Sequence, residues 1–327
     1  MSFAHYIKEI GRGADAAGDL SEYDAHQLFG AMLDGGVPDL ELGAILIALR
    51  VKSESLPELL GFCNAMNERM FRLLAPAGKA QPVVLPSYNG ARHQPNLLPL
   101  LALLLHRFGV PVLIHGPLTG NGRIATAYIL RELGIMPCAS LAQTQEALDK
   151  GGIAFVPTAV LAPGLADVLS LRARLGVRSS AHSLAKLVDP FESECLRVIS
   201  VSHPPYLDVM REFLLATAAH ALLLRSTEGE PFANPKRRPR LEYFRDSSAQ
   251  ILFEAEAGPV KSIPTLPAAI DAATTAAWIK GVMTGEAPVP LPLVNQLACC
   301  LYGSGYTNDM NQAKAIVAVE TGSLAAA

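Results

Sequence analysis

Residues 19–66 determine the fold of the N-terminal part of the chain; their sequence is DLSEYDAHQLFGAMLDGGVPDLELGAILIALRVKSESLPELLGFCNAM. Its apolar residues recur at helical spacing. Its breaks carry helix start and stop residues: Ser21 precedes Asp24 by three positions, and Gly35-Gly36-Val37-Pro38 separates two helical segments. We therefore predict an all-helical lobe over residues 3–72.

One segment of this lobe, LGAILIAL at residues 42–49, is apolar on all sides. A helix of this kind has to be buried all round, because water would otherwise contact apolar surface. Two interpretations are open, the interior of the lobe or a contact with a second subunit. We favour a homodimer formed through the N-terminal helical lobe.

Beyond a Pro/Gly-rich joint at residues 75–82 the pattern changes. Short β-type runs at residues 83–85, 110–114 and 196–201 alternate with helical segments such as residues 97–108. This alternation predicts a mostly parallel central sheet flanked by helices. The expected architecture is a two-lobed α/β protein with a small all-helical N-terminal domain, residues 1–75, and a larger α/β domain, residues 76–327. Part of residues 165–190 is a candidate to pack on the first domain.

Composition excludes several classes of protein. Half of the 327 residues are hydrophobic and 17% are charged, which excludes intrinsic disorder. The net charge of −3 does not by itself indicate a polyanion partner. The five cysteines are scattered without a C-x-x-C pair, so we expect reduced thiols rather than disulfides or zinc. The N-terminus carries acids where a signal peptide is apolar, and the longest apolar runs reach only about ten residues. We expect a cytoplasmic protein without membrane contact.

Residues 19–66 resemble the helical domain of anthranilate phosphoribosyltransferases and the related nucleoside phosphorylases. The C-terminal segment VNQLACCLYGSGYTNDMNQAKAIVAVETGSLA, residues 294–325, is similar to that family's final helices. The resemblance spans the chain and implies the anthranilate phosphoribosyltransferase-like fold of glycosyl transferase family 3. In these enzymes a glycine-rich loop after the first strand binds the diphosphate of phosphoribosyl diphosphate.

The loop of this chain aligns with the family's loop without a gap, but most of its residues differ from those of the family. The family's G-T-G-G-D corresponds to residues 86–90, PSYNG, where a proline removes an N–H group and a tyrosine replaces a glycine. N-I-S-T corresponds to residues 96–99, NLLP, and K-H-G-N-R to residues 114–118, IHGPL. We expect His115 to be a packed residue at a strand end rather than an acid or base, and we assign no catalytic residue. The remnant of the phosphate loop consists of Ser87, Asn89, Gly90, Asn96, His115 and Gly116.

The family's metal-binding D-E pair corresponds to the region Thr227-Glu228-Gly229-Glu230. Glu228 and Glu230 are expected as two solvated loop acids, with Mg²⁺ ligation as the weaker interpretation. We expect no cofactor and no metal, and Mg²⁺ only if the chain is an enzyme. The family's S-S-K-S corresponds to residues 121–124, which leaves one cation, Arg123.

Cations gather where the resemblance places the cleft. LGVRSSAHSLAKLVDPF, residues 175–191, is similar to the acceptor-binding motif, in which Arg178 matches the arginine that holds the acceptor carboxylate. We expect seven cations to line or rim a basic groove: Arg123, Arg178, Lys186, Lys236, Arg237, Arg238 and Arg240. Such a groove beside aromatic residues is typical of a nucleic-acid site.

The last four belong to the polar stretch STEGEPFANPKRRP that continues into Arg240, expected as an exposed loop. This stretch resembles the YbiB-type branch of the family, which lacks the catalytic motifs and is associated with nucleic-acid binding as homodimers. The resemblance implies a homodimer that binds DNA or RNA without sequence specificity and has lost the phosphoribosyl-diphosphate site. Single strands are favoured, with double strands left open. The alternatives are a phosphoribosyl or glycosyl transferase of altered acceptor specificity that uses Mg²⁺, and a dimer that binds only protein.

Overall fold

The computed structural model describes residues 2–13, 15–78, 80–258 and 265–322. The chain divides into two compact units, one made of Met1–Arg72 and Thr158–Pro190 and the other of Leu73–Pro157 and Phe191–Ala327. The expected domains, residues 1–75 and 76–327, differ from these units chiefly at residues 158–190. The chain returns to the helical unit there after its third strand, in the region where part of residues 165–190 is expected to pack on the first domain.

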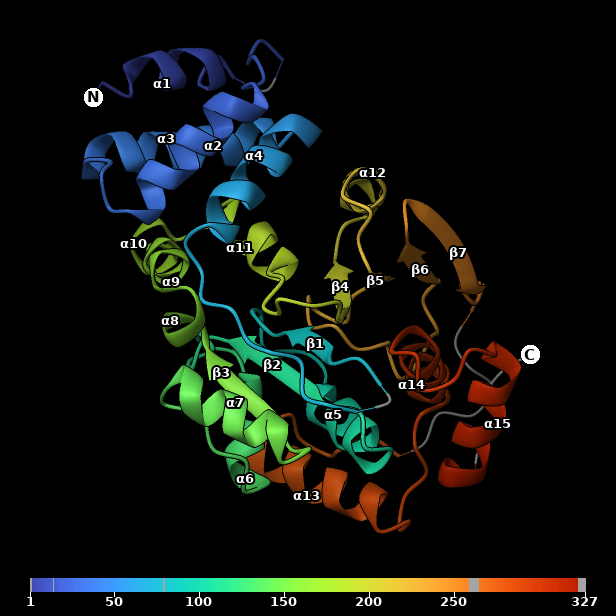
Figure 1. The fold of residues 1–327 in the computed structure, drawn as a ribbon. Helices are drawn as coiled ribbons and strands as arrows, with labels where there is room; N and C mark the ends of the chain where they lie inside the picture. The colour runs from blue at the N-terminus through green and yellow to red at the C-terminus, as the bar shows by residue number, and fades with distance from the viewer. Residues whose placement is uncertain (1, 14, 79, 259–264, 323–327) are drawn as a thin grey trace. The chain divides into compact units, whose positions relative to one another are not determined.

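Unit 1 is all-helical, as predicted (Figure 1). The Ser21 hydroxyl caps its second helix by accepting from the Asp24 N–H at 3.1 Å, and Ser55 and Glu58 form a capping box at its fourth. Its helices are α1 (Ala4–Ile10), α2 (Glu22–Leu33), α3 (Asp39–Lys52), α4 (Leu56–Asn67), α8 (Thr158–Leu161), α9 (Pro163–Ser170), α10 (Arg172–Leu175), α11 (Ala181–Leu184) and the 3₁₀ turn η1 (Ala185–Leu187).

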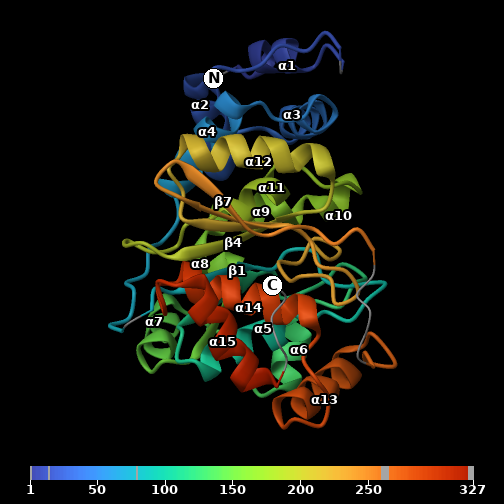
Figure 2. The ribbon, with the colours of Figure 1, turned by 90° about the vertical axis from the view of Figure 1, so that its right-hand side faces the viewer.

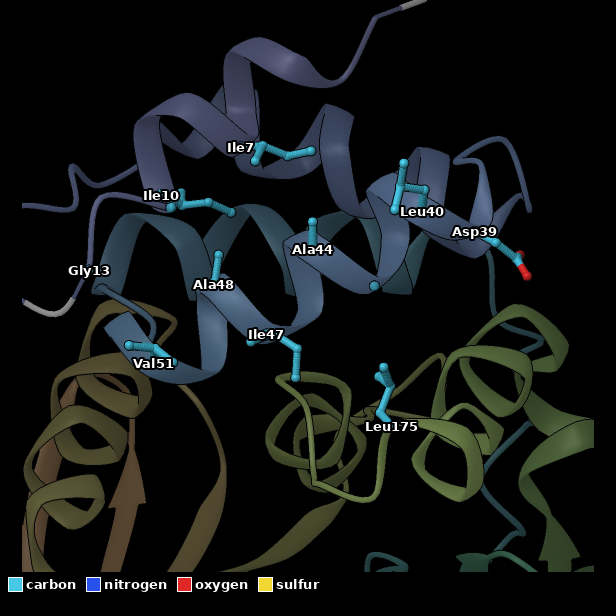
Figure 3. Close-up of a pocket in the computed structure, with 12 residues that line it drawn as sticks. Ile7, Ile10, Gly13, Asp39, Leu40, Ala44, Ile47, Ala48, Val51 and Leu175 are labelled. Atoms are coloured by element: carbon cyan, nitrogen blue, oxygen red, sulfur yellow. The ribbon is translucent and has the colours of Figure 1, made fainter.

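Helix α3 buries only one of its faces within the chain. Ile45 and Leu49 are fully buried in the unit, whereas Leu40 and Ile47 on other faces are 84% and 40% exposed. Burial wholly inside the lobe, one of the two interpretations, is therefore wrong for this helix. Figure 3 shows the exposed side of α3 facing α1 and α10, where apolar side chains line a groove of about 690 Å³. The second subunit that would cover this groove stays a prediction.

Unit 2 contains one seven-stranded sheet in the order β3-β2-β1-β4-β5-β6-β7. Strands β1 to β5 run parallel, and β6 and β7 continue the sheet as an antiparallel hairpin. The five parallel strands are almost wholly buried and rich in Val, Leu and Ile, as expected for strands covered on both faces. The bounds are β1 (Val83–Pro86), β2 (Val112–Gly116), β3 (Ile153–Pro157), β4 (Leu196–Val201), β5 (Ala221–Arg225), β6 (Leu241–Arg245) and β7 (Ser248–Phe253).

Helices cover both faces of this sheet (Figure 2). One face packs against two apolar helices, α5 (Leu98–Arg107) and α14 (Leu291–Gly303), and the other packs against α12 (Pro204–Ala216). The remaining helices are α6 (Thr126–Glu132), α7 (Leu141–Asp149), α13 (Ala272–Met283) and α15 (Met310–Thr321). The predicted α/β fold with a mostly parallel sheet is confirmed. The carboxyl ends of the parallel strands lie together at one edge, where ligands of such sheets bind.

The cysteines and the lengths of the helices are two further features of the structure. All five cysteines are buried and reduced. Among the described residues, no helix combines the length and the apolar character that crossing a membrane requires.

Candidate functional site

Three loops meet at the carboxyl ends of β1, β2 and β5. The Ser87 N–H donates to the His115 carbonyl at 2.8 Å, which joins the ends of β1 and β2. A β-bridge between Ala91 and Ile124 joins the loops that follow these strands. Gly116 permits this approach, because a Cβ at that position would lie 1.9 Å from the Ser87 carbonyl oxygen. The remnant of the phosphate loop is thus held in a fixed conformation.

Glu230, in the loop after β5, fills this remnant. One carboxylate oxygen accepts from the N–H groups of Asn89 and Gly90 at 2.8 and 2.7 Å, and the other accepts from the Ser87 hydroxyl at 2.6 Å. The side chain of Glu230 is fully buried. Two backbone N–H groups and a hydroxyl that converge on one anion form a nest of the kind that binds phosphate. In this protein the anion is the chain's own carboxylate.

Two further buried side chains complete the surroundings of Glu230. The Thr126 hydroxyl, at the start of α6, lies 2.7 Å from the Ser87 hydroxyl and 3.4 Å from Glu230. The Asn96 amide donates to the Thr126 oxygen at 2.8 Å. The buried carboxylate is therefore surrounded by hydrogen-bond donors, which offsets the cost of removing its charge from water.

Glu228 fills a second nest two residues away. Its carboxylate accepts from the N–H groups of Arg92, His93 and Gln94 at 3.0, 2.8 and 2.8 Å. The guanidinium of Arg123 lies 3.6 Å from the same carboxylate and 3.4 Å from the Gly90 carbonyl oxygen. Arg123, the one cation kept from the family's S-S-K-S motif, thus pairs with an acid of this chain.

The turn that carries both acids has an unusual backbone. Glu228 and Gly229 have φ angles of +55° and +97°, and Thr227 and Glu230 form a β-bridge across the turn. A Cβ at Gly229 would lie 1.7 Å from the Asn89 side-chain nitrogen. A non-glycine residue in the left-handed region is held there by surrounding contacts, which here are the hydrogen bonds of the two carboxylates.

The expectation of two solvated acids is therefore wrong for Glu230, because all the contacts of its carboxylate are with protein donors. Glu228 is also largely covered, with 13% of its side chain exposed. Across the described ranges no group of three or more His, Cys, Asp or Glu side chains is arranged to hold a metal ion. Both acids already accept hydrogen bonds from the loop after β1, so Mg²⁺ would compete with these N–H donors for the carboxylate oxygens.

His115 is a packed residue at the end of β2. Its Nδ1 atom lies 2.8 Å from the Tyr88 hydroxyl, and its Nε2 atom has no hydrogen-bond partner among the described residues. Complete burial lowers the pKa of His115 to about 3, so the imidazole is neutral near pH 7. The neutral, buried ring of His115 therefore holds Tyr88, the tyrosine that replaces a loop glycine of the family, through this hydrogen bond.

The basic loop after β5 is less uniform than predicted. Lys236 is exposed, and its ammonium group makes no hydrogen bond or ion pair among the described residues. Arg237 donates to the carbonyl oxygens of Glu256 and Ala257, and Arg240 pairs with Glu254 at 3.0 Å. These two arginines hold the chain that follows β7 while remaining exposed.

Arg238 in the same loop is partly buried. It donates to the Glu254 carbonyl at 3.1 Å, and its guanidinium lies 5.1 Å from the centre of the Phe253 ring. This residue therefore has a packing role.

The other two predicted cations, Arg178 and Lys186, belong to unit 1. Both lie near His182, where burial, followed by the charge of Arg178 and then of other cations that include Lys186, lowers the histidine pKa to about 3. Lys186 itself is 9% exposed, so a predicted groove cation is nearly buried.

Sequence reasoning missed four residues of the site, namely Thr126, Arg92, His93 and Gln94. Thr126 was not singled out, because a threonine before an apolar helix carries no distinctive signal. Arg92 and His93 follow the altered loop and are exposed. Their proximity to Glu228 depends on a contact across more than 130 residues of sequence, which no local pattern reveals.

Comparisons with known proteins agree with this fold. Residues 4–70 match a glycosyl transferase family model, that of the helical bundle domain. The anthranilate phosphoribosyltransferase of Novosphingobium aromaticivorans is 26% identical over 297 residues, 90% of this chain and 89% of that protein. The crystal structure of anthranilate phosphoribosyltransferase from Thermus thermophilus shares the fold with a TM-score of 0.76 and 23% identity, covering 97% of this chain and 94% of that one.

The YbiB protein of Escherichia coli (strain K12) is similar along nearly the whole chain. It is 45% identical over 306 residues, which are 93% of this chain and 95% of YbiB. Together with the helical-domain match and the shared fold, this similarity shows that the chain belongs to the anthranilate phosphoribosyltransferase-like family, glycosyl transferase family 3.

Proposed function

We propose that this protein is a cytoplasmic homodimer that binds DNA or RNA without sequence specificity and does not use the ancestral diphosphate site. One observation carries the part of the proposal that concerns the diphosphate site: Glu230 occupies the N–H nest of the loop after β1. A phosphoribosyl diphosphate would have to displace a buried carboxylate from the donors that phosphate needs. Without this site the fold would not carry out the phosphoribosyl transfer of the related enzymes.

Exposed cations near the filled nest support the nucleic-acid part of the proposal. Arg92 lies at the rim, where its N–H holds Glu228, and Lys236 lies on the same connection as Glu230, six residues further on. Arg237 and Arg240 are also exposed. Such side chains neutralise phosphates of a polymer and release counterions, which favours binding regardless of base sequence.

The apolar groove of unit 1 supports the homodimer. Ile7, Leu40, Ile47 and Val51 line it on α1 and α3, and most of its lining is apolar (Figure 3). A second copy of this face would remove these side chains from water, and a twofold contact needs only one self-complementary patch. Two sites in a dimer bind one strand more tightly than either does alone.

The length of the nucleic acid tests the dimer and the binding together. Fluorescence anisotropy is measured with labelled single strands of about 15 and about 30 nucleotides, in DNA and RNA forms. We expect the longer strand to bind at least tenfold more tightly per molecule in both forms. Equal affinity for the two lengths contradicts the two-site dimer, and a strong preference for one base sequence contradicts non-specific binding.

A second candidate is a phosphoribosyl or glycosyl transferase of altered acceptor specificity that uses Mg²⁺. The likeness to an anthranilate phosphoribosyltransferase over 90% of the chain favours it. It requires Mg²⁺ to compete with the N–H donors of the two nests for the carboxylates of Glu228 and Glu230. Phosphorus NMR of phosphoribosyl diphosphate with Mg²⁺ and the protein distinguishes the two candidates. We expect no acceptor-dependent release of diphosphate, and such release with turnover would establish the transferase.

A further inference from the structure

We propose that Glu230 and Glu228 are built-in anions that close the loop after β1 to phosphate, and that Glu230 determines the ligands which this site rejects. Removing its carboxylate is expected to create a binding site for inorganic phosphate or diphosphate. This inference concerns the interior of unit 2 and does not depend on nucleic-acid binding.

The contacts of Glu230 match those that a phosphate oxygen requires. The N–H groups of Asn89 and Gly90 point to one carboxylate oxygen, and the Ser87 hydroxyl points to the other. All three donors are buried. They are held in place by the close approach of Gly116 to Ser87 and by the bridge that follows Gly90. The nest therefore persists without an external ligand, because the chain supplies the anion.

Glu228 repeats the arrangement in the adjoining segment. Three consecutive N–H groups, from Arg92 to Gln94, converge on its carboxylate, and Arg123 adds a positive charge at 3.6 Å. Residues 87–94 thus form two consecutive nests, and two acids separated by one glycine fill both. In a solvent-exposed turn, nothing would require both carboxylates to point at the N–H groups of the loop after β1.

The backbone of the turn fits the same role. Gly229 has a φ of +97° and packs against the Asn89 side chain, so a larger residue does not fit there. Glu228 takes a left-handed conformation that costs free energy in isolation. The hydrogen bonds of the two acids offset this cost, which ties the conformation of the turn to the occupation of both nests.

The test is rescue of a variant by small anions. Glu230→Ala leaves the N–H groups of Asn89 and Gly90 buried without an acceptor, so its Tm should fall by on the order of 5 °C. Thermal unfolding is then followed with added phosphate, diphosphate or acetate at constant ionic strength, balanced with chloride. We expect a saturable rise in Tm that recovers at least half of the loss. The unaltered protein and Glu212→Ala, a matched control at an exposed acid of α12, should show no such rise.

Amide resonances show where the anion binds. In a ¹⁵N-labelled sample of Glu230→Ala, phosphate should shift the amide signals of Asn89 and Gly90 saturably, and in the unaltered protein these signals should stay in place. A folded Glu230→Ala that binds no anion overturns the proposal. So does a saturable phosphate response at Asn89 and Gly90 in the unaltered protein.

Glu228→Ala keeps the proposal testable if Glu230→Ala does not fold. The nest of Glu228 is partly accessible, and we expect phosphate to shift the amide signals of His93 and Gln94 in that variant alone. A folded Glu228→Ala without this response also contradicts the proposal. Failure of the unaltered protein to bind nucleic acid, by contrast, would remove the proposed function and leave the anion results unaffected.

Discussion

A carboxylate oxygen of Glu230 accepts a hydrogen bond from the backbone N–H of Gly90 at 2.7 Å, across 140 residues of sequence. This bond ties the loop after β5 to the loop after β1. In a parallel sheet the same edge offers free N–H groups to a phosphate. Here the donors are used within the protein, so the loop keeps its nest while the nest is closed to other anions.

Lys236→Glu should weaken nucleic-acid binding without affecting the fold. Lys236 is exposed and its ammonium group makes no hydrogen bond or ion pair within the described structure, so the thermal melt should stay within about 1 °C of the unaltered protein. We expect affinity for a single strand to fall about three- to tenfold, with a salt slope smaller by roughly one. Lys150→Glu, the same charge change at an exposed lysine just after α7, serves as the control and should leave affinity nearly unchanged.

Arg238→Ala should lower stability as well as removing a charge. Its guanidinium donates to the Glu254 carbonyl and stacks on Phe253, and loss of both contacts should cost roughly 1–2 kcal/mol of unfolding free energy. Chemical denaturation measures this cost. Unchanged stability would show that Arg238 is a surface cation like Lys236 and that its packing contacts contribute little.

Ile47→Arg should separate the subunits while leaving each chain folded. Ile47 is 40% exposed in the groove of unit 1, so arginine fits on the monomer surface but is buried without a partner in a dimer. Sedimentation velocity should report a monomer with a nearly normal melt. Ile45→Arg is the matched change on the buried side of α3 and should unfold the unit, because Ile45 is fully buried. A normal dimer with Ile47→Arg contradicts the assigned interface.

The stability of the protein should decrease as the pH falls below about 6.5. Burial lowers the pKa of His115 to about 3, so between these values the unfolded chain binds a proton that the folded chain does not. The contribution of the neutral, buried His115 to the free energy of unfolding is complete above about pH 6.5. It is lost as the pH falls toward about 3, by up to about 1.4 kcal/mol per pH unit. His115→Gln should lower stability at neutral pH but make its pH dependence shallower. An equal slope in urea titrations of both proteins between about pH 6 and about pH 4 would show that His115 does not titrate this way.

The elements of this fold could be predicted where local chemistry determines them. The Ser21 cap, the apolar run of α5 and the short runs that became β1, β2 and β4 each follow from the residues themselves. The apolar spacing of α3 identified a helix, and its excess of apolar residues left one face uncovered within the chain.

The filling of the site could not be predicted, because it depends on contacts between distant loops. Residues 227–230 resemble any short acidic turn, and only the fold brings Glu230 to Asn89 and Glu228 to His93. The same reasoning applies to residues 158–190, whose short helices gave only a weak signal that they pack with unit 1. The exposure expected of the basic loop holds for Lys236, whereas Arg238 became part of the packing around Phe253.

Whether the protein binds nucleic acid is measured by fluorescence anisotropy with a labelled mixed-sequence single strand of about 30 nucleotides, at salt concentrations from about 50 to about 200 mM. We expect sub-micromolar affinity at the lowest salt and a linear fall of log affinity with log salt, whose slope reports the number of phosphates neutralised. Absence of binding at the lowest salt would contradict the proposed function.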